Sequence, residues 1–225
     1  SGGTFRVNSH LGGDAYVTGG RLGGTGTLDS VTIATGGTLA PGNSIGTLNV
    51  LDMTFNSGSS VEAYEIELND GGFVAGTNND LLAASEDVTI NGGTVHVTPE
   101  NGTDDGSGYT PGTYTIITAV DGVSGTFTTL TDDYAFLDFT LDYDTFGQVN
   151  LISALSGGGG GGACPTGLTF NQGNTCGGVL SLGSGDAVYD AVITLSSADT
   201  PAALDSLSGE IHASAKTALL EDSRL

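Results

Sequence analysis

Serine and histidine are the side chains in this sequence that could support hydrolytic chemistry. Gly42-Asn43-Ser44-Ile45-Gly46 matches the G-x-S-x-G nucleophile elbow, which needs a strand before the serine and a helix after it. Here Pro41 precedes the motif and a strand-like run, residues 45–50, follows it, which predicts a turn between strands. The histidines are scattered, and no spacing points to a catalytic triad; they are His10, His96 and His212. We therefore predict that the chain is not an enzyme.

Oxygen ligands for calcium occur at two places. Residues 23–29 are similar to the nonapeptide G-G-x-G-x-D-x-U-x, but Asp29 falls one position late and the motif is not repeated. A second candidate is the acidic row Asp138, Asp142 and Asp144, because carboxylates are ligands that Ca²⁺ prefers. A Gly-rich turn and a solvated acidic face are the simpler interpretations. We predict no cofactor, with weak Ca²⁺ binding by the acidic row as the alternative.

Cys164 and Cys176 lie in one polar, Gly-rich segment. A metal site with two thiols and no nearby histidine is not favoured, because structural zinc sites use four ligands. A local disulfide is the preferred interpretation, and it indicates an oxidising compartment. Two free thiols remain the alternative.

Composition excludes several classes of partner. The chain has 225 residues, 39 of them Gly, and a formal net charge of −22. Binding to nucleic acid requires clustered Lys and Arg, and anionic lipid attracts the same side chains, so neither partner is expected. No segment approaches the length of a transmembrane helix. The first residues resemble the middle of a repeat, so we expect the chain to be a fragment.

The elements that would position these residues are mostly short β-strands. Segments that start at Val17, Val31 and Val88 each combine alternating β-branched residues with a Gly-containing turn. Within one of them, Val31 and Ile33 should lie on one face and Thr32 and Ala34 on the other. Repeated short strands form a solenoid or a sandwich, and recurrence of one motif favours the solenoid. On a strand of this kind, His96 should face solvent.

Longer strands are expected in the second half of this region. Residues 50–70 predict a hairpin around residues 56–59, and residues 114–127 predict two strands around Asp121-Gly122. Across residues 137–144, apolar and polar side chains alternate, which predicts a half-buried strand with an acidic outer face.

The composition changes twice toward the C-terminus. Residues 157–162 are consecutive glycines, which are typical of a flexible linker. We predict a β-region over residues 1–155, a linker with the cysteine loop over 156–186, and a helical segment over 187–225. Thr200-Pro201 should start a helix, with Thr as the N-cap and Pro at the first helical position. Leu204, Leu207 and Ile211 then follow at helical spacing.

Four segments resemble the autotransporter (type V secretion) family, in the order usual for it. They are GGTLAPGNSIGTLNV (36–50), NDLLAASEDVTINGGTVHV (79–97), YTIITAVDGVSGTF (114–127) and LSGEIHASAKTALLEDSRL (207–225). The resemblance covers about residues 23–225. It implies an all-β fold, a right-handed parallel β-helix (solenoid) with a β-hairpin cap, followed by a short helical C-terminal segment.

The resemblance also implies a location and specific roles. The chain would be the C-terminal end of a passenger at the bacterial cell surface, exposed or secreted, with its own outer-membrane β-barrel as partner. Its folding cap, the autochaperone region, would include Tyr114, Ile116, Gly122, Gly125 and Phe127. The lead-in to the barrel would include Leu207, Ser208, Gly209, Glu210 and His212. The glycine run and the cysteine pair depart from the family pattern.

Three functions follow from these observations. The first is a structural and folding segment that supports secretion and display of an upstream region, with adhesion as its purpose. The second is a self-associating adhesin or a fibre subunit of a biofilm, since exposed strand edges can join chain to chain. The third is the stalk of an enzyme whose catalytic residues lie upstream.

Overall fold

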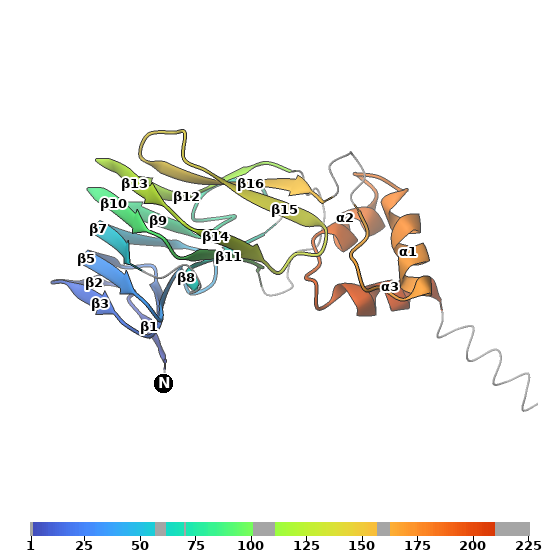
Figure 1. Cartoon of the computed structure of the whole chain (residues 1–225), viewed down its shortest axis with the longest axis horizontal. Helices are drawn as coiled ribbons and strands as arrows, with labels where there is room; N and C mark the ends of the chain where they lie inside the picture. The colour runs from blue at the N-terminus through green and yellow to red at the C-terminus, as the bar shows by residue number, and fades with distance from the viewer. Residues whose placement is uncertain (1, 57–61, 70, 101–110, 157–162, 210–225) are drawn as a thin grey trace, which may run out of the picture.

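Parallel β-sheets make up most of this protein, and three helices follow them (Figure 1). The computed structural model describes residues 2–56, 62–69, 71–100, 111–156 and 163–209. In Figure 1 the strands are stacked from β1 near the N-terminus to β13 at the opposite end, and the helices lie to one side of the stack. The expectation of an all-β fold with few helices is confirmed.

Within the described ranges, the smaller sheet has six strands, and all its pairs are parallel. In spatial order it contains β1 (Thr4–Arg6), β4 (Gly20–Gly24), β6 (Gly37–Pro41), β8 (Glu62–Leu68), β11 (Thr94–Pro99) and β14 (Thr129–Asp132).

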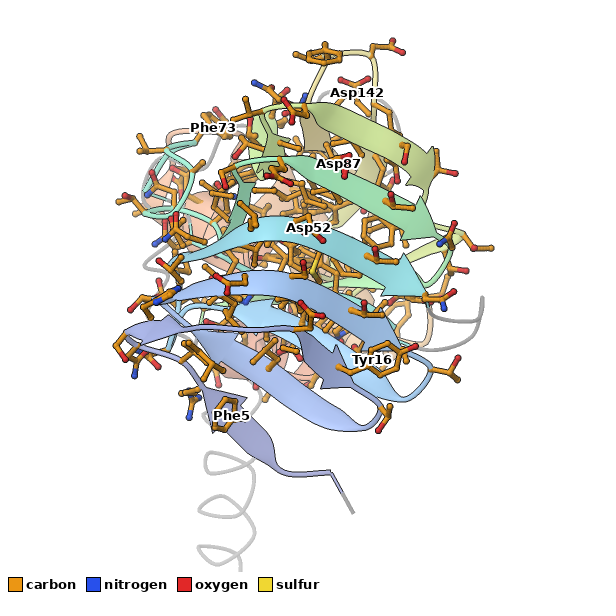
Figure 2. The ribbon with its side chains drawn as sticks, turned by 90° about the vertical axis from the view of Figure 1, so that its left-hand side faces the viewer. Phe5, Tyr16, Asp52, Phe73, Asp87 and Asp142 are labelled. Atoms are coloured by element: carbon orange, nitrogen blue, oxygen red, sulfur yellow. A yellow bond between two sulfur atoms is a disulfide. The ribbon has the colours of Figure 1, made fainter. Side chains whose placement is uncertain are left out.

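The larger sheet has ten strands in the same part of the chain. In chain order these are β2 (His10–Leu11), β3 (Ala15–Val17), β5 (Thr27–Ala34), β7 (Thr47–Asn56), β9 (Leu81–Ala84), β10 (Asp87–Asn91), β12 (Thr113–Ala119), β13 (Gly122–Thr126), β15 (Leu137–Asp142) and β16 (Gln148–Leu155). Figure 2 looks onto the outer side of this sheet, where Tyr16, Asp52 and Asp87 are labelled.

The chain passes back and forth between the two sheets, and each pass places a strand beside that of the previous pass. Equivalent positions are therefore separated by one pass along the sequence. A hydrogen bond from Thr25 to Asn8 spans 17 residues, and one between His96 and Thr131 spans 35. The passes lengthen toward the C-terminus, and the β8–β11 pairing shifts its register once, between Thr94 and Val95.

Alternation along the strands builds one continuous core. Val31 and Ile33 are buried, whereas Thr32 and Ala34 are half-buried on the other face, which confirms the expectation for this strand. In β15, Leu137 is buried and Asp138 is exposed, so the predicted half-buried strand is also present.

Pairing changes direction at the last strands. β12 pairs in parallel with β9 but antiparallel with β16, and β15 pairs antiparallel with β16. An antiparallel pair is what a β-hairpin cap requires. Parallel stacking therefore ends at β12 on this side of the larger sheet.

The hairpin predicted over residues 50–70 is wrong. β7 pairs with β5, β9 and β10 in the larger sheet, whereas β8 pairs with β6 and β11 in the smaller one. Both strands show the alternation of a hairpin arm, but parallel neighbours from other passes bury their apolar sides. Of the expected turn, residues 56–59, Asn56 ends β7, and residues 57–59 lie outside the described residues.

The helices are α1 (Phe170–Leu180), α2 (Ala187–Ile193) and α3 (Thr200–Ser208). α1 lies in the range predicted to be linker, so helical structure starts earlier than the sequence indicates. A capping box stabilises its start: the Thr169 side chain accepts a hydrogen bond from the Gln172 backbone N–H, and Gln172 Oε1 accepts one from the Thr169 N–H. The three-part division of the chain stays a prediction.

The start of α3 also differs by one residue from the prediction. Its N-cap is Asp199, and Thr200 is the first helical residue, with its hydroxyl donating to the Ser196 carbonyl at 2.8 Å. Leu204 is buried, as its helical spacing suggests, whereas Leu207 is 46% exposed. Ile211, the third member of the predicted stripe, lies outside the described residues.

Backbone hydrogen bonds join the helical segment to the sheets. The Ala135 N–H donates to the Leu195 carbonyl at 3.2 Å, and the Ser197 N–H donates to the Asp133 carbonyl at 2.6 Å. The apolar core is continuous across this junction and includes Cys176 and Leu204 from the helices. The helices are thus part of the same packed unit as the strands.

Candidate functional site

The predicted folding-cap residues lie in β12, in β13 and directly after β13. Tyr114 and Ile116 are buried in β12, and Phe127 is buried just beyond β13. Gly122 and Gly125 have φ of 121° and 78°, in the region that favours glycine. At Gly125 a Cβ would lie 2.0 Å from the Ile90 carbonyl oxygen. The apolar members of the motif therefore contribute to the core, and this glycine permits close approach of β10.

A bulge in β12 marks the change from parallel to antiparallel pairing. In the pairing with β16, Thr115 is opposite Asn150 and Ile117 is opposite Val149, so Ile116 is the extra residue. A bulge leaves its extra residue outside the regular ladder. The carbonyl groups of Thr115 and Ile116 accept hydrogen bonds from side chains outside this pair of strands.

Tyr64 and Asn79 donate these bonds. The Tyr64 hydroxyl donates to the Ile116 carbonyl at 2.6 Å, and Asn79 Nδ2 donates to the Thr115 carbonyl at 2.8 Å. Both side chains are fully buried, where a carbonyl without a partner would destabilise the fold by about 1–3 kcal/mol. These contacts attach β12 to β8 and to the segment before β9.

Asp80 extends the same network to the turn before β7 and to a second position in β8. One carboxylate oxygen accepts from the Gly46 N–H at 2.9 Å and the other from the Glu67 N–H at 3.0 Å. The side chain is buried, and burial raises the pKa of Asp80 from its ordinary 3.8 to about 8. Tyr64, Asn79 and Asp80 together are called the buried polar cluster below.

Aromatic packing places Tyr64 at the centre of this region. Its ring centroid lies 5.6 Å from that of Phe55 and 6.1 Å from that of Phe127. Burial raises the pKa of the Tyr64 hydroxyl well above its ordinary 10, and the nearby Asp80 charge adds to this effect. Tyr64 therefore stays a neutral donor and connects a predicted cap residue, Phe127, with another, Ile116.

Sequence reasoning missed the members of this cluster as functional residues. Asn79 and Asp80 belong to a segment that resembles the autotransporter family, but no role was predicted for either. The available signal was an Asn-Asp pair directly before the apolar run of residues 81–84. Tyr64 had no comparable signal, because its partner Ile116 is 52 residues away in the sequence.

Of the residues considered for catalysis, Ser44, His10 and His96 lie in the described part of the chain, and each contacts other partners there. Ser44 lies in a turn after Gly42, whose φ is 85°, and its hydroxyl donates to Glu100 Oε1 at 2.9 Å. Strand β7 follows Ser44, whereas a nucleophile elbow needs a helix after its serine. His10 contacts Asp29, and His212 lies outside the described residues.

His96 belongs to a row of polar groups on the outer side of the smaller sheet. Its Nδ1 lies 2.9 Å from Thr131 Oγ1 and its Nε2 lies 3.3 Å from Asp133 Oδ2. A hydrolytic triad has its hydroxyl at Nε2 and its carboxylate at Nδ1, whereas His96 has them the other way round, and Thr131 and Asp133 are exposed on strand or turn surfaces. Such cross-strand polar pairs stabilise a sheet, and we assign the row that role.

The predicted calcium ligands do not form a cluster. Asp138 accepts a hydrogen bond from the Ser156 hydroxyl, and Asp142 accepts one from the Asp144 backbone N–H. Asp29, from the nonapeptide-like candidate over residues 23–29, accepts a hydrogen bond from the Gly13 N–H and contacts His10. Among the residues the structure describes, no three His, Cys, Asp or Glu side chains are grouped so that they could hold a metal ion.

The cysteines form a disulfide, as the sequence predicts. Cys164 is joined to Cys176, which lies in α1 and is fully buried. Gln172 of the same helix donates to the Pro201 carbonyl and to Asp205 of α3. The bridge therefore attaches the segment before α1 to a packed pair of helices.

The predicted lead-in motif is partly described. Leu207 and Ser208 end α3, and Gly209 follows with φ of 71°, a common way to end a helix. Glu210 and His212 lie outside the described residues. None of the helices in the described part of the chain is long and apolar enough to span a membrane.

Comparisons place this sequence beside secreted proteins. No protein-family model matches the chain. An extracellular serine protease of Serratia marcescens is 34% identical to it over 148 residues, which cover 63% of this chain and 13% of that protein. A second extracellular serine protease of the same species is 35% identical over 108 residues, 45% of this chain and 10% of that protein. The matches thus span about a tenth of the length of these relatives.

Proposed function

We propose that the chain is the C-terminal segment of an autotransporter passenger, a right-handed parallel β-helix that ends in a folding cap. The observation that carries the proposal is the change from parallel to antiparallel pairing at β12. It falls within the segment that resembles the family's autochaperone region. Similarity to extracellular serine proteases supports a secreted or surface location.

The cap would assist folding because of how stacked strands gain stability. In a stack of parallel passes, each pass is stabilised mainly by its neighbours, so folding nucleates at one place and propagates. An antiparallel pair at the end joins residues that are close together in the sequence. The entropic cost of forming the first contacts is therefore smaller. Antiparallel β15 and β16 then offer β12, and through it β9, a surface on which to assemble.

The helical segment would connect this cap to a translocator. We propose the protein's own outer-membrane β-barrel as its partner, with the lead-in motif that starts at Leu207 as the connection. The exposure of Leu207 supports this role, since an apolar side chain at the end of α3 is available for a further contact.

Hydrogen exchange on the intact chain tests the cap. We expect the amides of β12, β15 and β16 to be the most protected and to exchange by global unfolding only, whereas β1–β4 exchange at lower denaturant. A protection pattern with its maximum in the N-terminal strands would contradict a C-terminal folding cap.

A display assay tests the role in secretion. The chain is placed between a reporter domain and an outer-membrane β-barrel, and surface reporter is measured by protease accessibility in intact cells. Gly125→Val, which breaks the approach of β13 to β10, should reduce protease-resistant reporter at the surface. Gly167→Val is the matched control, because a Cβ at this glycine would meet no other atom within 4 Å.

A second candidate function is a non-catalytic stalk for an upstream protease. The observation that favours it is the name of the relatives, extracellular serine protease, together with the small share of each that the chain matches. Catalysis would then reside outside the matched segment. The purified chain should cleave no casein or peptide library; serine-hydrolase labelling of Ser44 would overturn this division.

A further inference from the structure

Repeats create a problem of register in this fold. Successive passes have similar strands with Gly-rich turns, so a strand that pairs with the wrong pass buries nearly the same apolar side chains. Apolar packing alone therefore discriminates weakly between the native pairing and a slipped one. Buried polar groups favour the native pairing over a slipped one more strongly, because a slip leaves these groups without hydrogen-bond partners.

The buried polar cluster makes its hydrogen bonds between different passes of the native pairing. The hydrogen bond from Tyr64 to Ile116 spans 52 residues, that from Asn79 to Thr115 spans 36, and that from the Gly46 N–H to Asp80 spans 34. A slip of one pass would move each of these groups away from its partner. Together the contacts connect the turn before β7, strand β8, the start of β9 and strand β12.

The place of the cluster is also specific. It lies at the bulge of β12, the strand that pairs in parallel with β9 on one side and antiparallel with β16 on the other. The carbonyls of Thr115 and Ile116 are used by side chains from earlier passes, so the bulge is fixed relative to β8 and β9. Asn79 Nδ2 also donates to the Asp80 carbonyl at 2.7 Å, which orients its amide.

We propose that Tyr64, Asn79 and Asp80 are positioning residues that set the register of the parallel strands on the folding cap. The inference rests on the proposed function, since it assumes that strands assemble on β12. It adds which residues select the correct pass and predicts that their contacts form at the rate-limiting step of folding.

Refolding kinetics of the whole chain test this role. Tyr64→Phe removes one hydroxyl and keeps the ring, and Asn79→Leu removes the amide at similar volume. We expect each to refold about tenfold more slowly, or to add a slow phase from misregistered molecules, with less than about a twofold change in the unfolding rate. Far-UV circular dichroism after a denaturant jump measures both rates, because the chain has no Trp.

Tyr16→Phe is the matched control. Tyr16 is 66% exposed on β3, so loss of its hydroxyl should leave both rates unchanged within about twofold. In the double variant of Tyr64 and Asn79, the fold reduction in refolding rate should not exceed the product of the fold reductions in the two single variants. The reason is that both contacts fix the same bulge. Variants that unfold faster but refold at the wild-type rate would show that the cluster only stabilises the finished fold.

Two outcomes separate this inference from the proposed function. If β12, β15 and β16 are the most protected strands but the variants refold at the wild-type rate, the register role is wrong and the cap remains. If those strands are not the most protected in the wild type, the cap is wrong whatever the variants do.

Discussion

At the scale of single residues, Gly125 shows how the backbone constrains the fold. Its φ of 78° and the 2.0 Å distance from a Cβ to the Ile90 carbonyl oxygen both oppose any side chain. We expect Gly125→Ala to lower the free energy of unfolding by about 3 kcal/mol, from backbone strain and displacement of β10. Equilibrium urea unfolding measures the difference.

Gly167 supplies the control for this substitution. It has a similar φ of 86°, but no atom lies within 4 Å of its Cβ position. Gly167→Ala should therefore lower the free energy of unfolding by only about 1 kcal/mol. Equal losses at the two positions would show that the contact with Ile90 contributes nothing.

Asp80 predicts how stability depends on pH. Burial raises the pKa of its carboxyl from 3.8 to about 8 in the folded state, so the folded chain holds the proton more tightly than the unfolded chain. The contribution of the protonated Asp80 carboxyl to the free energy of unfolding is fully present below pH 4 and is lost as the pH rises through 8. The slope from this residue is at most about 1.4 kcal/mol per pH unit.

Asp80→Asn separates this effect from those of other acids. Burial also raises the pKa of Glu67 and of Asp132, which gives the same sign of slope. The amide cannot ionise, so the variant should lose less stability between pH 5 and pH 8 than the wild type, measured by urea unfolding at each pH. Its absolute stability should be lower at pH 5, because the amide replaces one of two acceptor oxygens. Parallel pH profiles for the two proteins would show that Asp80 does not titrate in this range.

At the scale of elements, the disulfide and α1 depend on each other. The bridge closes a loop with a sequence separation of 12, which the chain-entropy model equates with about 3 kcal/mol. We expect Cys164→Ala/Cys176→Ala to destabilise α1 by about that amount and to raise amide exchange across Phe170–Leu180. Hydrogen exchange with mass spectrometry resolves this segment.

The strands provide the internal control for this variant. The bridge joins only the segment before α1 to α1, so we expect exchange in β5, β7 and β12 to change little. Loss of protection throughout the sheets would indicate instead that the helices are required for the β-region to fold. Treatment of the wild type with reductant should reproduce the effect of the double substitution.

At the scale of the whole molecule, charge opposes association. The chain has a formal net charge of −22, although β1 leaves one edge of the smaller sheet without a neighbour among the described strands. We expect a monomer by size-exclusion chromatography with light scattering, with or without reductant. Repulsion between copies is screened within about 3 Å at 1 M salt, so the same measurement at high salt tests the edge itself.

Assembly would change the functional proposal. A large, concentration-dependent species at physiological salt would favour the self-associating adhesin or fibre subunit over the stalk. Its loss in reductant would show that the Cys164–Cys176 bridge maintains the required geometry or that cysteines link chains directly.

Local patterns in the sequence determined much of this protein. Period-two alternation placed Val31 and Ile33 in the core, Gly-containing turns separated short strands, and the two cysteines paired as expected. These features depend on neighbours in the chain, so the sequence displays them directly. The charge of −22 likewise follows from composition alone.

Tertiary structure decided which strands pair and which polar groups are buried. The alternation of β7 and β8 suits a hairpin as well as two parallel stacks, and only neighbours from other passes select the stack. α1 forms in a Gly-rich segment, where helix propensity is low, because its cap and its contacts with α3 stabilise it. Tyr64 meets Ile116 across 52 residues, and a contact at that distance has no local pattern, since its partner is fixed only when the intervening passes have stacked.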